Sequence, residues 1–182
     1  MTATIKLVTA EDLWLMPGDE PWEVWEGELR KVPAAGGEAS SIGAVIVGML
    51  FPVVRSSKLG LLTGADGTYR LGLDPDTVVV PDAAFVRWDR LPDGVAPKKY
   101  IPVPPDLAVE VISPTDEPGD IARKRELYRR AGVPLVWWVD PDRRTVAVYR
   151  DGVLVAELGE GDALDGGEVL PGLRLPIVEI VA

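Results

Sequence analysis

The sequence has no cysteine and no histidine among its 182 residues. Without cysteine, the chain has no disulfide framework, no thiolate metal site and no cysteine nucleophile. Without histidine, it has no Ser–His–Asp triad, no imidazole acid or base and no histidine-bound metal. Proton transfer therefore falls to Asp, Glu, Lys, Tyr or water. A metal would need oxygen ligands, which favour hard cations such as Mg²⁺, Mn²⁺ or Ca²⁺.

Positive charge is also scarce. The chain has 19 Lys and Arg residues against 29 Asp and Glu residues, so its formal net charge is −10. Such a surface keeps a protein soluble and repels nucleic acid at long range. The charge is uneven, however, because one short segment is basic. That segment contains Arg123, Lys124, Arg125, Arg129 and Arg130.

The sequence shows no signal-peptide pattern, and its longest apolar-rich stretch, 42–54, is too short to cross a bilayer. We therefore expect a cytoplasmic protein without a membrane partner. Its length and its 47% hydrophobic residues suit a single domain over 1–182. Within it we expect an N-terminal helix and hairpin (1–38), a core (39–141) and a β extension (142–182).

Hydrophobic periodicity and turn residues predict an α/β core. The elements expected first are a helix opened by Thr9, a strand pair over 22–32, a buried helix from Ser40 or Ser41 to about Val54, and strands over 61–63, 69–73 and 77–86. After a polar loop over 89–105 we expect a strand over 107–112, a helix over 120–131 capped by Asp120, a strand over 135–139 and a hairpin around Asp151-Gly152. The strand–helix–strand unit over 107–139 predicts a right-handed crossover between parallel strands.

Two carboxylates interrupt apolar strand patterns. Asp82 would share a strand face with Val80, Ala84 and Val86, and Glu110 lies within the apolar strand 107–112. A buried carboxylate costs several kcal/mol unless it is paired, protonated or bound to a cation. Asp82 and Glu110 on adjacent strands therefore predict a site for a divalent ion.

Lys124 is a third unusual residue, because it lies within the apolar stripe of the helix over 120–131. It is three residues from Ile121 and Leu127 and four from Tyr128. A cation at this position could orient a water molecule or stabilise charge on a phosphate. The alternative is that Lys124 only extends its ammonium to solvent past apolar neighbours.

In this order, Pro81-Asp82, Glu110 and a helical Lys resemble the PD-(D/E)XK nuclease superfamily. The whole chain more closely resembles the Uma family of restriction endonucleases. The matching segments are 22–28, Pro81-Asp82, 109–114, Lys124 with Tyr128, 131–133 and 138–141. This resemblance implies a restriction-endonuclease-like core (αβββαβ) and Mg²⁺-dependent (or Mn²⁺-dependent) hydrolysis of phosphodiester bonds. It also implies nucleic acid, DNA above all, as the partner.

Two positions depart from the pattern of these relatives. The superfamily places a Lys two residues after the Glu, where this sequence has Ile112, so the role of that Lys would pass to Lys124 or be absent. Many members of the family also carry a His before the first core helix, whereas the segment 36–40 has none. Glu23 and Glu28 leave two possibilities open: a further carboxylate near the metal, or exposed hairpin residues without a function.

We therefore expect a metal-dependent endonuclease in which Asp82 and Glu110 bind the metal and Lys124 completes the catalytic set. A catalytically inactive binding or interaction module of the same fold is the alternative. A carboxylate-pair hydrolase such as a glycosidase is a weaker reading, since it leaves a buried lysine unexplained. Exposed hairpin edges and Trp-rich strand ends favour a homodimer.

Overall fold

The computed structural model describes residues 7–18 and 20–181. Its main sheet has six strands in the order β10-β9-β8-β7-β6-β3. These strands are β3 (Gly60–Gly64), β6 (Ala83–Arg87), β7 (Leu107–Val111), β8 (Leu135–Asp140), β9 (Thr145–Arg150) and β10 (Val153–Leu158). Strands β7 and β8 are parallel, as predicted, and the other neighbours are antiparallel. The helix between β7 and β8 is α3 (Pro118–Arg130).

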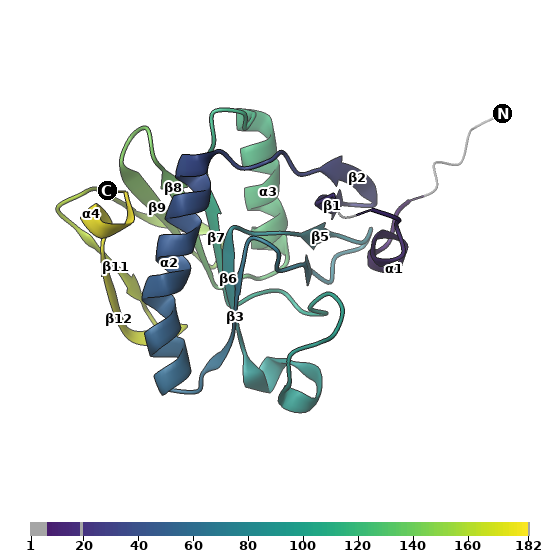
Figure 1. The fold of residues 1–182 in the computed structure, drawn as a ribbon, viewed down its shortest axis with the longest axis horizontal. Coiled ribbons are helices and arrows are strands. Elements are labelled where there is room, and N and C mark those ends of the chain that lie inside the picture. The colour runs from purple at the N-terminus through teal and green to yellow at the C-terminus, as the bar shows by residue number, and fades with distance from the viewer. Residues whose placement is uncertain (1–6, 19, 182) are drawn as a thin grey trace.

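One long helix lies on each face of this sheet (Figure 1). Helix α2 (Gly37–Ser56) packs Ile42, Ile46 and Leu50 against the face that carries Phe85 and Val109. Helix α3 packs against the opposite face, which carries Ala108, Val136 and Trp138. Because side chains alternate along a strand, Glu110 points to the α3 side while its neighbours Val109 and Val111 point to α2.

A second sheet has the strand order β2-β1-β5-β4. It contains β1 (Trp22–Trp25), β2 (Glu28–Lys31), β4 (Tyr69–Arg70) and β5 (Val78–Val79), and the short helix α1 (Ala10–Trp14) lies beside it. The helix expected to open at Thr9 and the strand pair expected over 22–32 are both confirmed: Thr9 and Asp12 form a capping box, and the hairpin turns at Glu26-Gly27. This sheet carries the β1–β2 hairpin to the side of α3 (Figure 1).

The remaining elements complete the chain. A hairpin of β11 (Ala163–Gly166) and β12 (Leu170–Pro176) is followed by α4 (Ile177–Ile180), and these pack against α2. The loop after β6 contains the 3₁₀ turns η1 (Trp88–Arg90) and η2 (Pro92–Gly94). The hairpin around Asp151-Gly152 forms as β9 and β10, in agreement with the prediction.

Three sequence-based boundaries were wrong. The run 77–86 divides into β5 and β6, which belong to different sheets, so Asp82 lies in the break between strands rather than within one. Helix α2 begins at Gly37, because an additional first turn packs Ala39 into the core. Helix α3 is capped by Glu117 and begins at Pro118, whose fixed φ suits a first helical position, so Asp120 lies inside the first turn.

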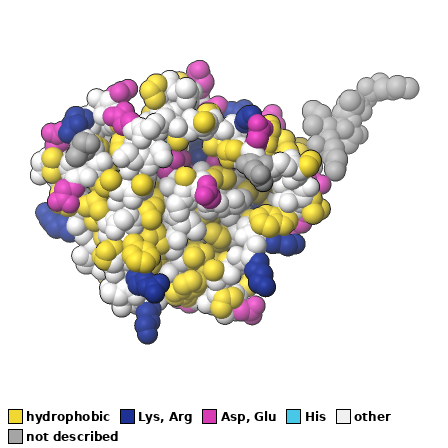
Figure 2. All heavy atoms as spheres, viewed as in Figure 1, with side chains coloured by type: hydrophobic (Ala, Val, Ile, Leu, Met, Phe, Trp, Pro, Cys, Tyr) yellow, Lys and Arg dark blue, Asp and Glu magenta, His cyan; other side chains and the backbone are white. Residues whose placement is uncertain are grey.

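The apolar stretch in α2 is longer than the sequence analysis assumed. The helix has 20 residues, and its most apolar 18-residue window has a mean hydropathy of 1.7. By length and composition alone it could cross a membrane, so the expectation that it is too short was wrong. A core helix with one buried face meets the same criteria. Apolar side chains gather over α2 in Figure 2. Val45 and Phe51 of this helix are exposed.

Candidate active site

Four charged side chains from four parts of the chain line one cavity of about 180 Å³. Glu23 comes from β1, Asp82 from the break between β5 and β6, Glu110 from β7 and Lys124 from α3. The cavity therefore opens where the β1–β2 hairpin meets the crossover of the main sheet. The structure brings together four of the five residues considered for the site, because Glu28 does not line this cavity.

Lys124 is the positive centre of this cluster. Its Nζ lies 2.8 Å from Oε1 of Glu110 and 2.9 Å from Oε1 of Glu23, and only 13% of the side chain is exposed. Burial disfavours the charged ammonium, but the negative charges of Glu110 and Glu23 outweigh this effect and raise the pKa of Lys124. Lys124 is therefore a permanent cation inside the site and does not simply extend to solvent.

Glu110 is held at one oxygen and open at the other. Its Oε1 accepts hydrogen bonds from Lys124 and from the hydroxyl of Tyr128, which lies one helical turn after Lys124 on α3. Within the described part of the chain, no side chain or backbone group donates to its Oε2. Burial, with a contribution from Asp82 and Glu23, raises the pKa of Glu110 to about 8 even though Lys124 lowers it.

Asp82 shows the same pattern of one bound and one open oxygen. Its Oδ2 accepts the backbone N–H of Val111 at 2.7 Å, which ties the break between β5 and β6 to the end of β7. Residues 7–18 and 20–181 provide no donor to its Oδ1. Burial raises the pKa of Asp82, and the hydrogen bond from Val111 and the charge of Lys124 oppose that rise.

Glu23 is buried, so of the two possibilities for this residue, exposure on the hairpin was wrong. Its Oε1 accepts the backbone N–H of Val80 at 2.7 Å, and its Oε2 accepts Nε1 of Trp25 at 2.6 Å. Glu28 differs, because its exposed carboxylate forms an ion pair with Arg123 at 2.9 Å. The hairpin thus contributes one carboxylate to the cavity and one to its surface.

Sequence reasoning missed the partners that orient these carboxylates, Trp25 and Tyr128. A signal was present for both. Trp25 is two residues from Glu23 and so shares its strand face, and Tyr128 is four residues from Lys124 and so shares its helix face.

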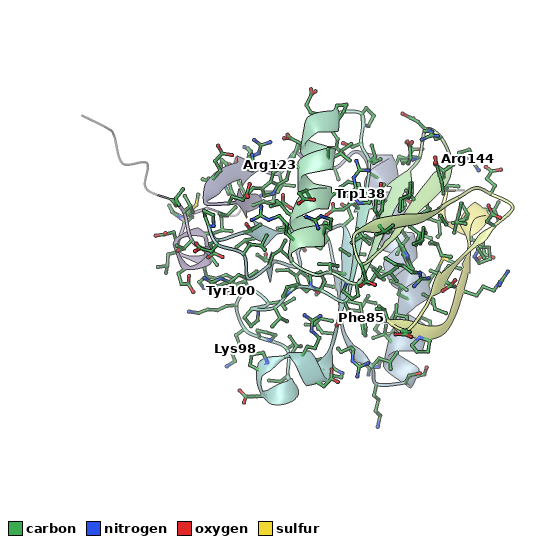
Figure 3. The ribbon with its side chains drawn as sticks, turned by 180° about the vertical axis from the view of Figure 1, so that it is seen from behind. Phe85, Lys98, Tyr100, Arg123, Trp138 and Arg144 are labelled. Atoms are coloured by element: carbon green, nitrogen blue, oxygen red, sulfur yellow. The ribbon has the colours of Figure 1, made fainter. Side chains whose placement is uncertain are left out.

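The basic segment of α3 does not form an open positive surface. Arg123 and Arg130 pair with Glu26, Arg129 pairs with Glu126, and Lys124 is engaged with two buried carboxylates. These partners neutralise most of the charge that the sequence places together. Figure 3 shows Arg123 on the side of α3 that faces the β1–β2 hairpin, where these acceptors lie.

The donor set can be judged against the ion that the sequence predicts. In the described ranges, no group of three or more Asp and Glu side chains is arranged to hold a metal. Asp82 and Glu110 instead line the same cavity, and each has one carboxylate oxygen that accepts no hydrogen bond from the described residues. Mg²⁺ is commonly held by one or two carboxylates with water and substrate phosphate, so this pair fits that ion.

The comparisons with known proteins agree with this architecture. The family model Uma2, described as "Putative restriction endonuclease", matches residues 10–178. Among solved structures, the chain is similar to a crystal structure of a "putative nuclease belonging to DUF820" from Anabaena variabilis ATCC 29413. The two share 23% identity with a TM-score of 0.80, over 96% of this chain and 97% of that one. No curated protein matches.

These findings define an α/β protein with the fold of that solved structure and a cavity lined by buried carboxylates and a lysine. The chain belongs to the Uma2 family, because the family model covers nearly its whole length.

Proposed function

We propose that this protein is a metal-dependent endonuclease that hydrolyses phosphodiester bonds in DNA. The observation that carries the proposal is the pair of open carboxylate oxygens on Asp82 and Glu110, beside the ammonium of Lys124 in one cavity. The main sheet and its two helices support it too. If β4 and β5 of the second sheet are set aside, these elements follow the order α2, β3, β6, β7, α3, β8, and the nuclease superfamily that the sequence resembles has the order αβββαβ.

Asp82 and Glu110 are the residues that would hold Mg²⁺ or Mn²⁺. Such an ion would supply Lewis acidity to a phosphate oxygen and lower the pKa of a water molecule. The hydrogen bond from Val111 to Asp82 and the one from Tyr128 to Glu110 hold the two carboxylates in place from behind. These hydrogen bonds fix the orientation of each carboxylate, so the fold sets the position of its free oxygen.

Lys124 would act through its charge rather than as a base. Its raised pKa keeps the ammonium protonated at neutral pH, so it has no lone pair with which to accept a proton from water. A fixed ammonium in a buried site can stabilise the negative charge that develops on the phosphate during attack. Glu23 would keep this ammonium in position, because hydrogen bonds from Val80 and Trp25 hold the Glu23 carboxylate.

One observation favours the alternative, a nuclease fold that binds without cleaving. The ammonium of Lys124 already pairs with two of the buried carboxylates, so part of their charge is balanced without an added cation. A metal titration distinguishes the two functions, because a binding module does not require Mg²⁺ or Mn²⁺.

The test is nicking of supercoiled plasmid in Mg²⁺ or Mn²⁺, combined with calorimetry of Mn²⁺ binding. We expect the wild-type protein to nick DNA, and Asp82→Asn and Glu110→Gln to lose at least about a hundredfold in rate. Asp120→Asn is the matched control, because Asp120 lines the same cavity but is exposed and pairs with Arg30. Equal nicking by Asp82→Asn, Glu110→Gln and wild type would contradict the mechanism, and a wild type without metal binding would favour the binding module.

A further inference from the structure

A second cavity adjoins the candidate active site on the far side of Trp138. It has a volume of about 190 Å³ and shares Ile121 and Trp138 with the cavity that contains Glu110. Its other walls come from the outer strands β9 and β10 and from α3. Figure 3 shows Trp138 on the side of α3 that faces these strands. The two cavities are therefore neighbours that share one wall.

Arg125 gives this second cavity a cation that no carboxylate neutralises. It is the one member of the basic segment on α3 that lacks an ion pair within the described ranges. Its guanidinium instead lies 5.3 Å from the ring centre of Tyr149, and its Nη1 donates a hydrogen bond to the Tyr149 hydroxyl. The charge of Arg125 is thus both available and held in one orientation, which lowers the entropic cost of binding an anion.

The acidic residues of the second cavity contact Arg143 rather than Arg125. The second cavity is lined by two arginines and two acidic residues, and the acidic pair is engaged locally: Glu157 with Arg143 at 2.9 Å, and Asp140 with the Arg143 backbone N–H at 3.0 Å. The opposite rim of the active-site cavity is less favourable to an anion. Its basic residues Arg30 and Lys31 are already paired with Asp120 and Glu20.

We propose that this second cavity binds the nucleotide next to the scissile phosphodiester, with its phosphate on Arg125 and its base or sugar against Tyr149. The inference rests on the proposed nuclease function and assigns the direction in which the nucleic-acid strand leaves the site. Guanidinium groups bind phosphate through several N–H donors, and aromatic faces accept bases of any sequence. The ligand is therefore a single strand of nucleic acid, which the cavity binds through a backbone phosphate and by stacking.

The experiment compares two substrates that differ in length. A labelled single-stranded oligonucleotide carries neighbouring phosphates that can reach Arg125, whereas bis(p-nitrophenyl) phosphate has a single phosphodiester and no neighbouring phosphate. We expect Arg125→Ala to lower kcat/KM about tenfold more on the oligonucleotide than on bis(p-nitrophenyl) phosphate. Tyr149→Phe keeps the ring and removes the acceptor for Arg125, so its differential loss should be smaller, about threefold.

Arg129→Ala is the matched control, since it removes the same charge from the same helix. Arg129 is exposed, pairs with Glu126 and lines neither cavity. Equal losses on both substrates for Arg125→Ala, or equal oligonucleotide losses for Arg125→Ala and Arg129→Ala, would overturn the subsite while leaving the nuclease function intact. A wild-type protein that cleaves neither substrate would overturn the nuclease function, and the subsite with it. Parallel assays with DNA and RNA oligonucleotides of one sequence show which nucleic acid the cavity binds.

Discussion

The ammonium of Lys124 lies 2.8 Å from Oε1 of Glu110, and the hydroxyl of Tyr128 donates to that same oxygen. Strand β7 and the helix that follows it are thus joined by a buried lysine–glutamate contact as well as by apolar packing. Since a buried pair is costly to break from either side, each of its members has a measurable effect on stability apart from catalysis.

Replacing Lys124 with methionine should destabilise the metal-free protein by about 3–5 kcal/mol, because two buried carboxylates lose their cation. Urea denaturation in the presence of EDTA measures this loss. Lys99→Met is the control, since Lys99 is exposed on a loop and should change stability by less than about 0.5 kcal/mol. Equal stability of the two variants would mean that Lys124 does not balance the charge of the site.

Metal-free stability should fall as pH rises from about 5 to 8. Burial raises the pKa of Glu110 to about 8 in the folded state, from an ordinary value of 4.5. The folded state therefore keeps a proton that the unfolded state releases in this interval, and ionisation favours unfolding. This contribution is fully present below pH 4.5 and is lost as the pH passes through the folded pKa.

Denaturation midpoints of wild type and Glu110→Gln across this interval isolate the effect. We expect the wild type to lose about 1–3 kcal/mol more than Glu110→Gln between pH 5 and 8. Glu126→Gln should retain the wild-type slope, because burial does not hold the exposed Glu126 protonated: its pKa is lowered by the hydrogen bond from Arg129. Parallel slopes for wild type and Glu110→Gln would contradict the assignment.

Tyr128→Phe should cost about 1–2 kcal/mol of stability and weaken Mn²⁺ binding, because Glu110 loses one of the two donors that orient it. Tyr100→Phe is a matched control in which the same hydroxyl is removed from an exposed contact, the 2.5 Å hydrogen bond to Glu11. That variant should lose less than about 0.5 kcal/mol and bind Mn²⁺ as the wild type does. Unaltered Mn²⁺ affinity in Tyr128→Phe would show that the hydroxyl does not position Glu110.

Gly43 on α2 offers a test of how closely this helix supports Asp82. A Cβ at Gly43 would lie 3.6 Å from the backbone oxygen of Asp82, which is ordinary van der Waals contact. Gly43→Ala should therefore raise stability by about 0.5–1 kcal/mol through helix propensity and leave nicking unchanged. In Gly60→Ala the new Cβ would lie 2.1 Å from the backbone oxygen of Val86, so this variant should be strongly destabilised.

The elements whose signals are local could be predicted from the sequence. The apolar run of β7, the alternation of β9 and β10 and the capping box at Thr9 each depend on neighbours a few residues apart. The division of 77–86 could not be predicted in this way, because it depends on which distant strands pair with each half. Strand β5 pairs with β1 and β4, whereas β6 pairs with β3 and β7.

Much the same holds for the site. Asp82, Glu110 and Lys124 stand out because a charge interrupts an apolar pattern, and the structure places them in one cavity. Their catalytic and metal-binding roles, the homodimer and the cytoplasmic location stay predictions. The burial of Glu23 had no decisive local signal, because it depends on contacts with Val80 and Lys124 from distant parts of the chain.

The amino-acid composition limits the groups available for metal binding and catalysis. They are oxygen ligands, carboxylates and lysine, because the chain has no thiol and no imidazole. The sequence also determined most of the helices and strands, since their periodicity is a short-range property. Which of the basic side chains have an ion-pair partner depends on contacts between distant parts of the chain. The partners of Arg123 and Arg130 lie 95 to 104 positions away along the chain. Arg125 on the same helix contacts Tyr149 and has no carboxylate partner among the described residues. Net charge is a sum over residues, but a binding surface depends on which of them the fold brings into contact.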